Sequence, residues 1–372
     1  MTRDRSFGTD RRQPRAFHVG RSGEVAGGMA QVLNGYRSGN FDEFDIRIVE
    51  SRDGSRGLAA IRIVAAAARQ LWRLASPHQG DVVVIHLSER GSFVREGALL
   101  LLARARGCGT VAHLHGSDFD SFARSVPILV RIVLRASHRV IVLSERAATT
   151  ARNFVEPERI VLVPNAVHPG ESTPEEQLIV FGGAVGSRKG IDVLLEAWRV
   201  VRQLSGVGHW RLMIAGPIAE QKFTKLLGSQ VGTGVEYLGP LSHRSLMALL
   251  DRSAIAVLPS RDEAMPVFIL EAMVRHNCVI ATDVGGIAAV LAQGAGIVIA
   301  PGDVAALVTA LTWIINDDLE RTLIGNRAAA AIRDRYAAAK VYPLLEEVWA
   351  AAARASARTK RSAPVVVYRG EP

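Results

Sequence analysis

One stretch of the sequence indicates the fold: LIVFGGAVGSRKGIDVLL, at residues 178–195. Its first apolar residues predict a buried strand, its middle is a glycine-rich loop with two cations, and the apolar spacing at its end predicts a helix. Glycines let backbone N–H groups approach an anion closely, and a helix N-terminus adds about half a positive charge. Arg188 and Lys189 add two full charges, so the loop suits a diphosphate; an ordinary loop with solvated cations is the alternative. The loop matches neither the Walker A sequence nor the G-x-G-x-x-G fingerprint.

The same alternation of strand and helix continues on both sides of this stretch. Further strands are predicted at Ala16–Val19, Asp45–Val49, Val82–His86, Thr110–His115, Val140–Leu143, Trp210–Ala215, Val235–Leu238, Ile255–Leu258 and Val279–Ala281. Helices are predicted between the strands, among them Met29–Tyr36, Leu58–Leu74, Ala98–Ala105 and Phe122–Ala136. This rhythm is typical of parallel sheets with helices on both faces.

The segment PNAVHPGESTPEEQ, at residues 164–177, interrupts the rhythm with three prolines and few apolar residues. It is typical of a linker between domains. We therefore expect an α/β protein with two Rossmann-like, doubly wound domains that face each other across a cleft, with ligands beyond the carboxyl ends of the strands. The expected parts are a disordered basic N-terminus (1–15), a first domain (16–168), a linker (169–177), a second domain (178–340), a C-terminal helix (341–354) and a basic tail (355–372).

Composition narrows the functional classes. The chain has 372 residues, 48% of them hydrophobic, so it can bury a large core, and its two cysteines exclude a disulfide framework and favour a cytoplasmic protein. Neither a secretory leader nor an apolar run long enough to span a membrane is expected. Residues 1–170 carry +8 of the net charge of +9, which suggests an anionic partner. Nucleic acid is disfavoured as that partner because no basic motif with interleaved aromatic residues is present.

A second motif, SRDEAMPVFILEAM at residues 260–273, contains two carboxylates eight residues apart. On a helix, Glu263 and Glu271 would lie about 12 Å apart, which is wider than the ~5–9.5 Å of a glycosidase pair. This spacing suits two carboxylates that hold opposite ends of one extended ligand. Two surface glutamates are the alternative, although an unpaired carboxylate in the apolar run around Glu271 would be costly.

A third motif, VAHLHGSDF at residues 111–119, places His113 and His115 on one face of a strand, shortly before Asp118. A metal site would need a third ligand, and no nearby residue has a suitable spacing, so no metal site is predicted. The open alternatives are a histidine that lines the cleft and a histidine with a structural role.

Three further segments could also bind an anionic partner, but their sequences are less specific than the three motifs above. Gly27 and Gly28 open the first helix and offer backbone donors, or form only a tight turn. The segment HLSERGSFVRE (86–96) offers His86, Ser92 and Arg95 to an anionic acceptor, or is a surface loop. The helix predicted over Phe122–Ala136 carries an arginine stripe that fits an anionic bilayer, or is a core helix with a solvated stripe.

Taken together, these motifs resemble the family 4 (group 1) glycosyltransferases of GT-B fold, over about residues 17–350. They occur in the family's order: AGGMAQVLNGY, HLHGSDF, VPNAV, the RKG loop, YLGPLSH, the E-x7-E box SRDEAMPVFILEAM, and TDVGGI. The resemblance implies that the first domain takes the acceptor, that the second takes the nucleotide-sugar, and that the last helix crosses back to the first domain. The opening helix and the 86–96 segment look like the branch that builds exopolysaccharide and other surface glycans.

The resemblance also implies residue roles. On the donor side it assigns the diphosphate to Gly183, Arg188 and Lys189, the transferred sugar to Glu263 with the backbone at Ala264 and Met265, and the ribose to Glu271. His115 would lie beside the sugar, so the catalytic candidates are His115 and Glu263. On the acceptor side it assigns Gly27, Gly28, Ser92, Arg95 and Asp118.

The implied activity is retaining transfer of a sugar from a nucleotide-diphosphate sugar to a glycan or a polyprenyl-diphosphate-linked acceptor. The resemblance implies that no metal or other cofactor is needed. It also implies a position at the inner face of the cytoplasmic membrane, peripheral to anionic lipid. Ala184, Ala264 and Ala289 stand where the family usually has Arg, Gly and Glu. These departures favour the alternative, a non-catalytic GT-B homologue that binds nucleotide-sugar or scaffolds a glycan assembly complex. A nucleotide-sugar epimerase is disfavoured by the E-x7-E box.

Overall fold

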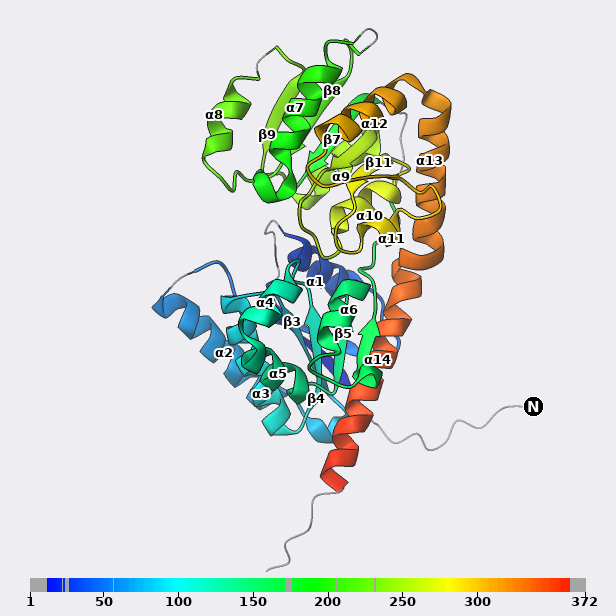
Figure 1. Ribbon diagram of the computed structural model, residues 1–372. Coiled ribbons are helices and arrows are strands. Elements are labelled where there is room, and N and C mark those ends of the chain that lie inside the picture. The colour runs from blue at the N-terminus through cyan, green and yellow to red at the C-terminus, as the bar shows by residue number, and fades with distance from the viewer. Residues whose placement is uncertain are drawn as a thin grey trace, which may run out of the picture.

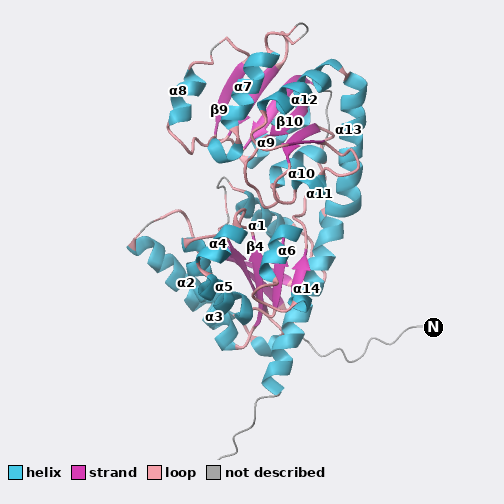
Figure 2. Ribbon diagram, in the orientation of Figure 1, coloured by secondary structure: helices cyan, strands magenta, loops and turns pink. Residues whose placement is uncertain are grey.

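The computed structural model describes residues 12–361 except residues 22, 24–26, 56, 171–175, 205–206 and 231. The chain forms two α/β domains, one above the other, with successive C-terminal helices, in residues 318–361, running down the side of both (Figure 1). Each domain contains one sheet between layers of helices (Figure 2). The architecture confirms the prediction of two doubly wound domains. The predicted N-terminal segment up to residue 11 and the predicted tail from residue 362 lie outside the described residues.

The N-terminal sheet is parallel, with the strand order β2-β1-β3-β4-β5-β6. Its strands are β1 (Arg15–Gly20), β2 (Asp45–Glu50), β3 (Val82–Leu87), β4 (Gly109–Leu114), β5 (Arg139–Val142) and β6 (Ile160–Leu162). The order reverses between β1 and β3. In an open parallel sheet, the crevice at such a switch point is where ligands bind.

The helices of this domain cover both faces of the sheet. They are α1 (Gly28–Ser38), α2 (Leu58–Leu74), α3 (Gly91–Arg106), α4 (Phe119–Ser125), α5 (Pro127–Ala136) and α6 (Glu145–Ala151), with short 3-10 turns at Pro77–Gln79 and Pro157–Arg159. Apolar residues of α2, α3 and α5 pack on one face. The helix α1 and the C-terminal helix α14 (Ala338–Arg361) pack on the other face, where Trp349 is fully buried.

The C-terminal sheet is also parallel, with the order β12-β11-β10-β7-β8-β9 and its switch point between β7 and β10. Its strands are β7 (Glu176–Gly182), β8 (Arg211–Ala215), β9 (Val235–Gly239), β10 (Ser253–Leu258), β11 (Cys278–Thr282) and β12 (Ile297–Ile299). Its helices are a 3-10 turn η3 (Ser187–Lys189), α7 (Ile191–Val201), α8 (Lys222–Gly228), α9 (His243–Arg252), α10 (Val267–Met273), α11 (Ile287–Val290), α12 (Val304–Asn316), α13 (Asp318–Ala331) and a π-helical turn (Ile332–Tyr336). One continuous hydrophobic core joins these elements.

A glycine lets the two loops at this switch point meet. Gly190 follows η3 in the left-handed conformation, with φ +70°. A Cβ atom there would lie 1.8 Å from the carbonyl oxygen of Pro259, at the end of β10. Only glycine allows the loop after β7 to pack this tightly against the loop after β10. The close approach brings Lys189 next to the Glu263 loop.

Several predicted elements need correction. The single helix predicted over Phe122–Ala136 is wrong: α4 ends before Val126, and α5 starts at Pro127, because proline lacks an N–H and favours the first turn of a new helix. The arginine stripe is therefore divided between two helices. The helix predicted from Ala98 begins at Gly91, so Ser92 and Arg95 are helical rather than part of a loop.

The boundaries at the linker and the C-terminus also differ in detail. β7 begins at Glu176, two residues before the predicted domain start, and α14 continues to Arg361, beyond the predicted start of a tail. In the part of the chain that the structure describes, no helix has the length and apolarity that a membrane crossing requires. Both cysteines, Cys108 and Cys278, are buried.

Candidate functional site

The centre of the site is an ion pair between Lys189 and Glu263. Lys189 ends η3, after β7, and Glu263 lies in the loop after β10, so the switch point of the sheet brings them together. Both side chains are largely buried, and the Lys189 ammonium donates a hydrogen bond to Glu263 Oε1. The lysine lies over the chain at Gly183, where an added Cβ atom would be 3.4 Å from Lys189 Cε.

Two neighbours complete the surroundings of Glu263. Ser260 Oγ donates a hydrogen bond of 2.8 Å to Glu263 Oε1, and the Arg188 guanidinium lies 3.8 Å from the same oxygen. Arg188 is half exposed and also donates to the carbonyl oxygen of Asp262 at 2.9 Å. The structure thus gathers Gly183, Arg188, Lys189 and Glu263 around one position, where two cations lie beside one carboxylate.

The TDVGGI segment supports the backbone beside Glu263. The N–H of Gly286 donates to the carbonyl oxygen of Ala264 at 2.7 Å. Gly285 has φ +59°, and a Cβ atom there would lie 1.9 Å from the carbonyl oxygen of Glu263. Gly285 and Gly286 therefore support residues 263–264 by direct backbone contact.

Glu271 lies apart from this pair, on α10. It is buried, and its Oε1 lies 2.7 Å from Nε2 of His243, at the start of α9. The hydrogen bond to the Glu271 carboxylate raises the pKa of His243, against the opposite effect of partial burial. Both residues line a cavity of about 280 Å³. Its other walls come from α1, α14, Arg275 and residues 166–169.

The two domains touch across the cleft at the motifs. Ser117, directly before Asp118, donates a hydrogen bond to the Asp262 carboxylate in the loop that carries Glu263. Asn165 Nδ2, in the VPNAV segment, donates to the carbonyl oxygen of Met265 at 2.8 Å. A Cβ atom on Gly28 would lie 3.9 Å from Val267, so the N-terminus of α1 faces the start of α10.

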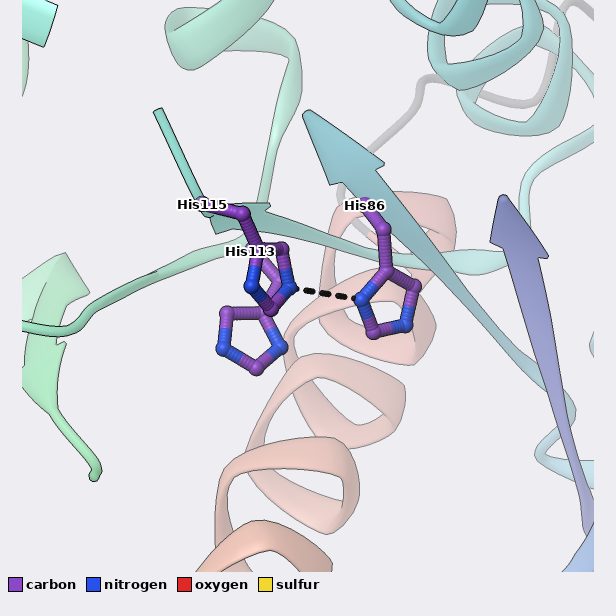
Figure 3. Close-up of side chains that lie close together, drawn as sticks. All are labelled: His86, His113 and His115. Carbon is purple, nitrogen blue, oxygen red and sulfur yellow. Dashed lines mark hydrogen bonds between the residues drawn. The ribbon is translucent and has the colours of Figure 1, made fainter. Parts of the chain in front are cut away.

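His115 lies directly after β4, but its ring turns toward the face of the sheet that α1 and α14 cover. Its Nε2 lies 2.8 Å from Nδ1 of His86, near the end of β3 (Figure 3). Burial lowers the pKa of His115 to about 3, so the ring is neutral at physiological pH. His113 joins the same group.

The expectation that no third residue joins His113 and His115 is therefore wrong. β3 and β4 are adjacent, and their register pairs His86 directly with His113. The spacing along the chain did not show this neighbour because the contact depends on the order of the strands.

The acceptor-side residues are only partly brought together. Gly27 and Gly28 are exposed at the N-terminus of α1. Asp118 precedes α4, and its N–H donates to Glu89 Oε1 at 2.9 Å. Ser92 is buried within α3. The Arg95 guanidinium lies 3.9 Å from the carboxylate of Glu96, its neighbour in α3.

Sequence reasoning missed several residues that shape the site: Ser117, Asn165, His243, Ser260 and Asp262. Ser117, Ser260 and Asp262 lie inside the motifs that were singled out, and Asn165 lies in VPNAV. Each could have been suspected as a polar residue in a motif. Ser260 has its partner, Glu263, three positions away, but the partners of Ser117, Asn165 and His243 lie 28 to 145 positions away along the chain.

Comparison with known families and proteins agrees with this geometry. Residues 176–317 match the family described as glycosyl transferases group 1, and residues 34–171 match glycosyltransferase family 4. The chain is 28% identical to a glycogen synthase of Mycobacterium tuberculosis over 59% of this chain and 52% of that protein. It is 22% identical to the amylovoran biosynthesis glycosyltransferase AmsK of Erwinia amylovora, over 73% and 70%.

Among solved structures, Anabaena Alr3699/HepE in complex with UDP and glucose superposes with a TM-score of 0.69, at 18% identity, over 90% of this chain and 98% of that one. The alignments with the first curated relatives span only 42% and 52% of those proteins. The two family matches cover most of both domains in the order of the chain, and the fold agrees with them. The chain belongs to the group 1, family 4 glycosyltransferases of GT-B fold.

Proposed function

We propose that the protein transfers a sugar, with retention, from a nucleotide-diphosphate sugar to a glycan or polyprenyl-diphosphate-linked acceptor. The observation that carries the proposal is the buried Lys189–Glu263 pair, with Arg188 beside it, at the switch point of the second domain. This position faces the N-terminus of α1 and the Ser117 loop of the first domain. A donor held at the pair would therefore lie between the domains, next to an acceptor.

The chemistry of the step follows from these charges. When the bond between the sugar and the diphosphate breaks, negative charge grows on the leaving phosphate, and cations placed there in advance lower the barrier. Lys189 and Arg188 supply two such cations from the chain itself, so we propose that transfer uses no metal or other cofactor. The leaving phosphate would help to deprotonate the acceptor hydroxyl on the same face of the sugar, which conserves the anomeric configuration.

Glu271 is proposed to bind the ribose of the donor. A buried carboxylate with one oxygen on His243 keeps a second oxygen for hydroxyl donors. The likeness to Alr3699/HepE in complex with UDP and glucose makes UDP the first nucleotide to test, and the likeness to AmsK supports a role in polysaccharide biosynthesis.

Nucleotide binding through Glu271 gives the direct test of this proposal. A saturating nucleotide, at about 100 times its dissociation constant, should stabilise the protein by about 2.7 kcal/mol. We expect one of UDP, GDP and ADP, alone or as its sugar, to raise the melting temperature of the native chain, and Glu271→Ala to lose that shift.

The matched control for this test is Glu196→Ala, which removes an exposed glutamate of α7 in the same domain. Its nucleotide shift should equal that of the native chain. If no nucleotide shifts the melting temperature of the native chain, or if Glu271→Ala keeps the shift, the proposed donor site is wrong.

The first domain also carries a surface that fits an anionic membrane. The helices α2 and α5 pack on the same side of the sheet, on either side of α3 (Figure 1). Exposed apolar side chains on them include Leu58, Ile61, Trp72, Ile128 and Ile132. Exposed arginines stand beside these, at positions 62, 69, 73, 131 and 135. Apolar side chains flanked by arginines are typical of interfacial helices, so we propose peripheral binding through this surface.

Vesicle co-sedimentation tests the membrane proposal. The native chain should bind anionic vesicles more strongly than zwitterionic ones, since each arginine near an anionic surface contributes about 1 kcal/mol. Replacing two exposed isoleucines, in Ile128→Ser/Ile132→Ser, should weaken partitioning at least about tenfold. The control is Leu319→Ser/Leu323→Ser on α13 of the other domain, which should bind like the native chain. Binding that does not depend on anionic lipid would contradict the proposal.

A further inference from the structure

Four histidines meet in the carboxyl halves of three neighbouring strands and directly after one of them, on the face of the N-terminal sheet that α1 and α14 cover. His18 comes from β1, His86 from β3, and His113 with His115 from the end of β4. Figure 3 shows the rings of His86, His113 and His115 gathered between the two strands, in front of α14. The donor chemistry proposed above uses none of these four side chains. Only His115 lies at the cleft.

Three of these rings bring nitrogen atoms to one point. One ring nitrogen from each of His86, His113 and His115 lies within 4.8 Å of the others. The centroids of the rings are 4.1 to 5.1 Å apart. His86 and His113 are 0% and 1% exposed, while His115 is partly exposed. The group is thus shielded from bulk water but touches the cleft through one member.

His113 is the unexplained member of the group. Neither of its ring nitrogens has a hydrogen-bond partner among the residues that the structure describes. A neutral imidazole has one donor and one acceptor nitrogen, and leaving both unpaired in the interior is costly. Buried polar side chains are nearly always satisfied, so an unpaired one calls for a missing partner.

The second ring nitrogen of His86 contacts another histidine, His18. Its Nδ1 faces His115, and its Nε2 lies 3.0 Å from Nδ1 of His18. The ring of His18 in turn packs edge-on against Trp349 of α14, at 4.8 Å. In metal sites, a second residue that bonds the remote nitrogen of a ligating histidine sets its tautomer and direction. His18 stands in that position relative to His86.

We propose that His86, His113 and His115 bind one divalent transition-metal ion of the Zn²⁺ type, with His18 as the residue that orients His86. Three imidazoles are a common ligand set for Zn²⁺, with nitrogen–metal distances of about 2.0–2.1 Å and a fourth position for water or another ligand. Mg²⁺ and Ca²⁺ prefer oxygen ligands, which these three side chains do not provide.

The ion would join the ends of β3 and β4 beneath the cleft. It would satisfy His113 and hold the ring of His115 in place, with entry through the exposed edge of His115. This role is separate from the transfer step, which the proposal above assigns to Lys189 and Arg188. The site therefore goes beyond the proposed function, and its test does not depend on transfer activity.

Metal binding to the full chain, prepared without a histidine tag, tests this inference. The metal content of the purified protein is measured first, and the chelator-treated protein is then titrated with Co²⁺ as a coloured substitute for Zn²⁺. We expect one equivalent of Co²⁺ to bind with the visible absorption of a low-coordinate nitrogen site, and Zn²⁺ to displace it.

Two variants make the result specific. His113→Leu replaces the unpaired ring by an apolar side chain of similar size, and should weaken metal binding by more than the roughly 10- to 100-fold expected for loss of a second-shell residue. His115→Ala, at the more exposed position, should do the same if His113→Leu does not fold. The control is His209→Leu, which removes an exposed histidine of the other domain and should bind like the native chain.

The inference is overturned if the native chain neither contains nor binds one equivalent of metal. It is equally overturned if His113→Leu and His115→Ala bind metal as the native chain does. Because none of these measurements uses a nucleotide, their failure is distinct from failure of the proposed donor site.

Discussion

Lys189→Met is expected to lower kcat/KM for sugar transfer by about 100- to 1000-fold, the loss seen when one pre-placed group that stabilises developing negative charge is removed. Lys189 is the more buried of the two cations at the switch point: its side chain is 13% exposed, against 51% for Arg188. A buried charge acts through a lower dielectric and so interacts more strongly with the leaving phosphate. Arg188→Met should therefore have the smaller effect.

The same change removes the partner of a buried carboxylate, and a drop in stability must be separated from a drop in catalysis. Removing one member of a buried ion pair costs about 3–5 kcal/mol because the other charge is left unpaired. The double variant Lys189→Met/Glu263→Gln removes both charges and should regain most of the lost stability. It should not regain activity, because the diphosphate still lacks its cation.

Melting temperature and initial rate, measured on the same preparations, decide between the two effects. The control is Lys225→Met, which removes an exposed lysine of α8 in the same domain and should keep both stability and rate. If the double variant recovers activity together with stability, Lys189 serves only to neutralise Glu263, and its proposed role at the diphosphate is wrong.

The donor side of the site was largely accessible to sequence reasoning because each of its parts is local. The glycine-rich loop and the helix after it are contiguous, and Gly183, Arg188 and Lys189 all lie within one stretch of seven residues. That Lys189 meets Glu263 follows once both are placed after strands at the same switch point, since carboxyl ends of parallel strands share one edge. Short elements such as β6, β12 and α8 were missed because three to seven residues carry too little periodicity.

The acceptor side was less accessible because it depends on contacts between distant segments. The pairing of His86 with His113 requires the strand order, and the contact of Ser117 with Asp262 requires both domains. Ser92 and Arg95 precede the helix that was predicted from Ala98, yet α3 begins at Gly91. Glycine is tolerated at a helix start, where its low propensity costs little.

Gly285→Ala is expected to have the second large effect, on stability and on the donor site together. Residue 285 has φ +59°, which costs about 1–2 kcal/mol for a residue with a Cβ atom. The new Cβ would also lie 1.9 Å from the carbonyl oxygen of Glu263 and 2.6 Å from that of Ala264. These atoms belong to the backbone and cannot rotate away, so the Glu263 loop itself must move, at an added cost of about 1–3 kcal/mol.

Gly302→Ala is the matched control for this change. Gly302 lies in the same domain with φ +79°, but no atom lies within 4 Å of the position that its Cβ would take. It should therefore show the conformational cost alone, with nucleotide binding and transfer unchanged. Gly285→Ala should lose more stability, by denaturant unfolding, and should also bind donor more weakly, because displacement of residues 263–264 moves the carboxylate that pairs with Lys189. Equal losses in the two variants, with donor binding kept in both, would show that the backbone contact beneath Glu263 does not hold the donor site in shape.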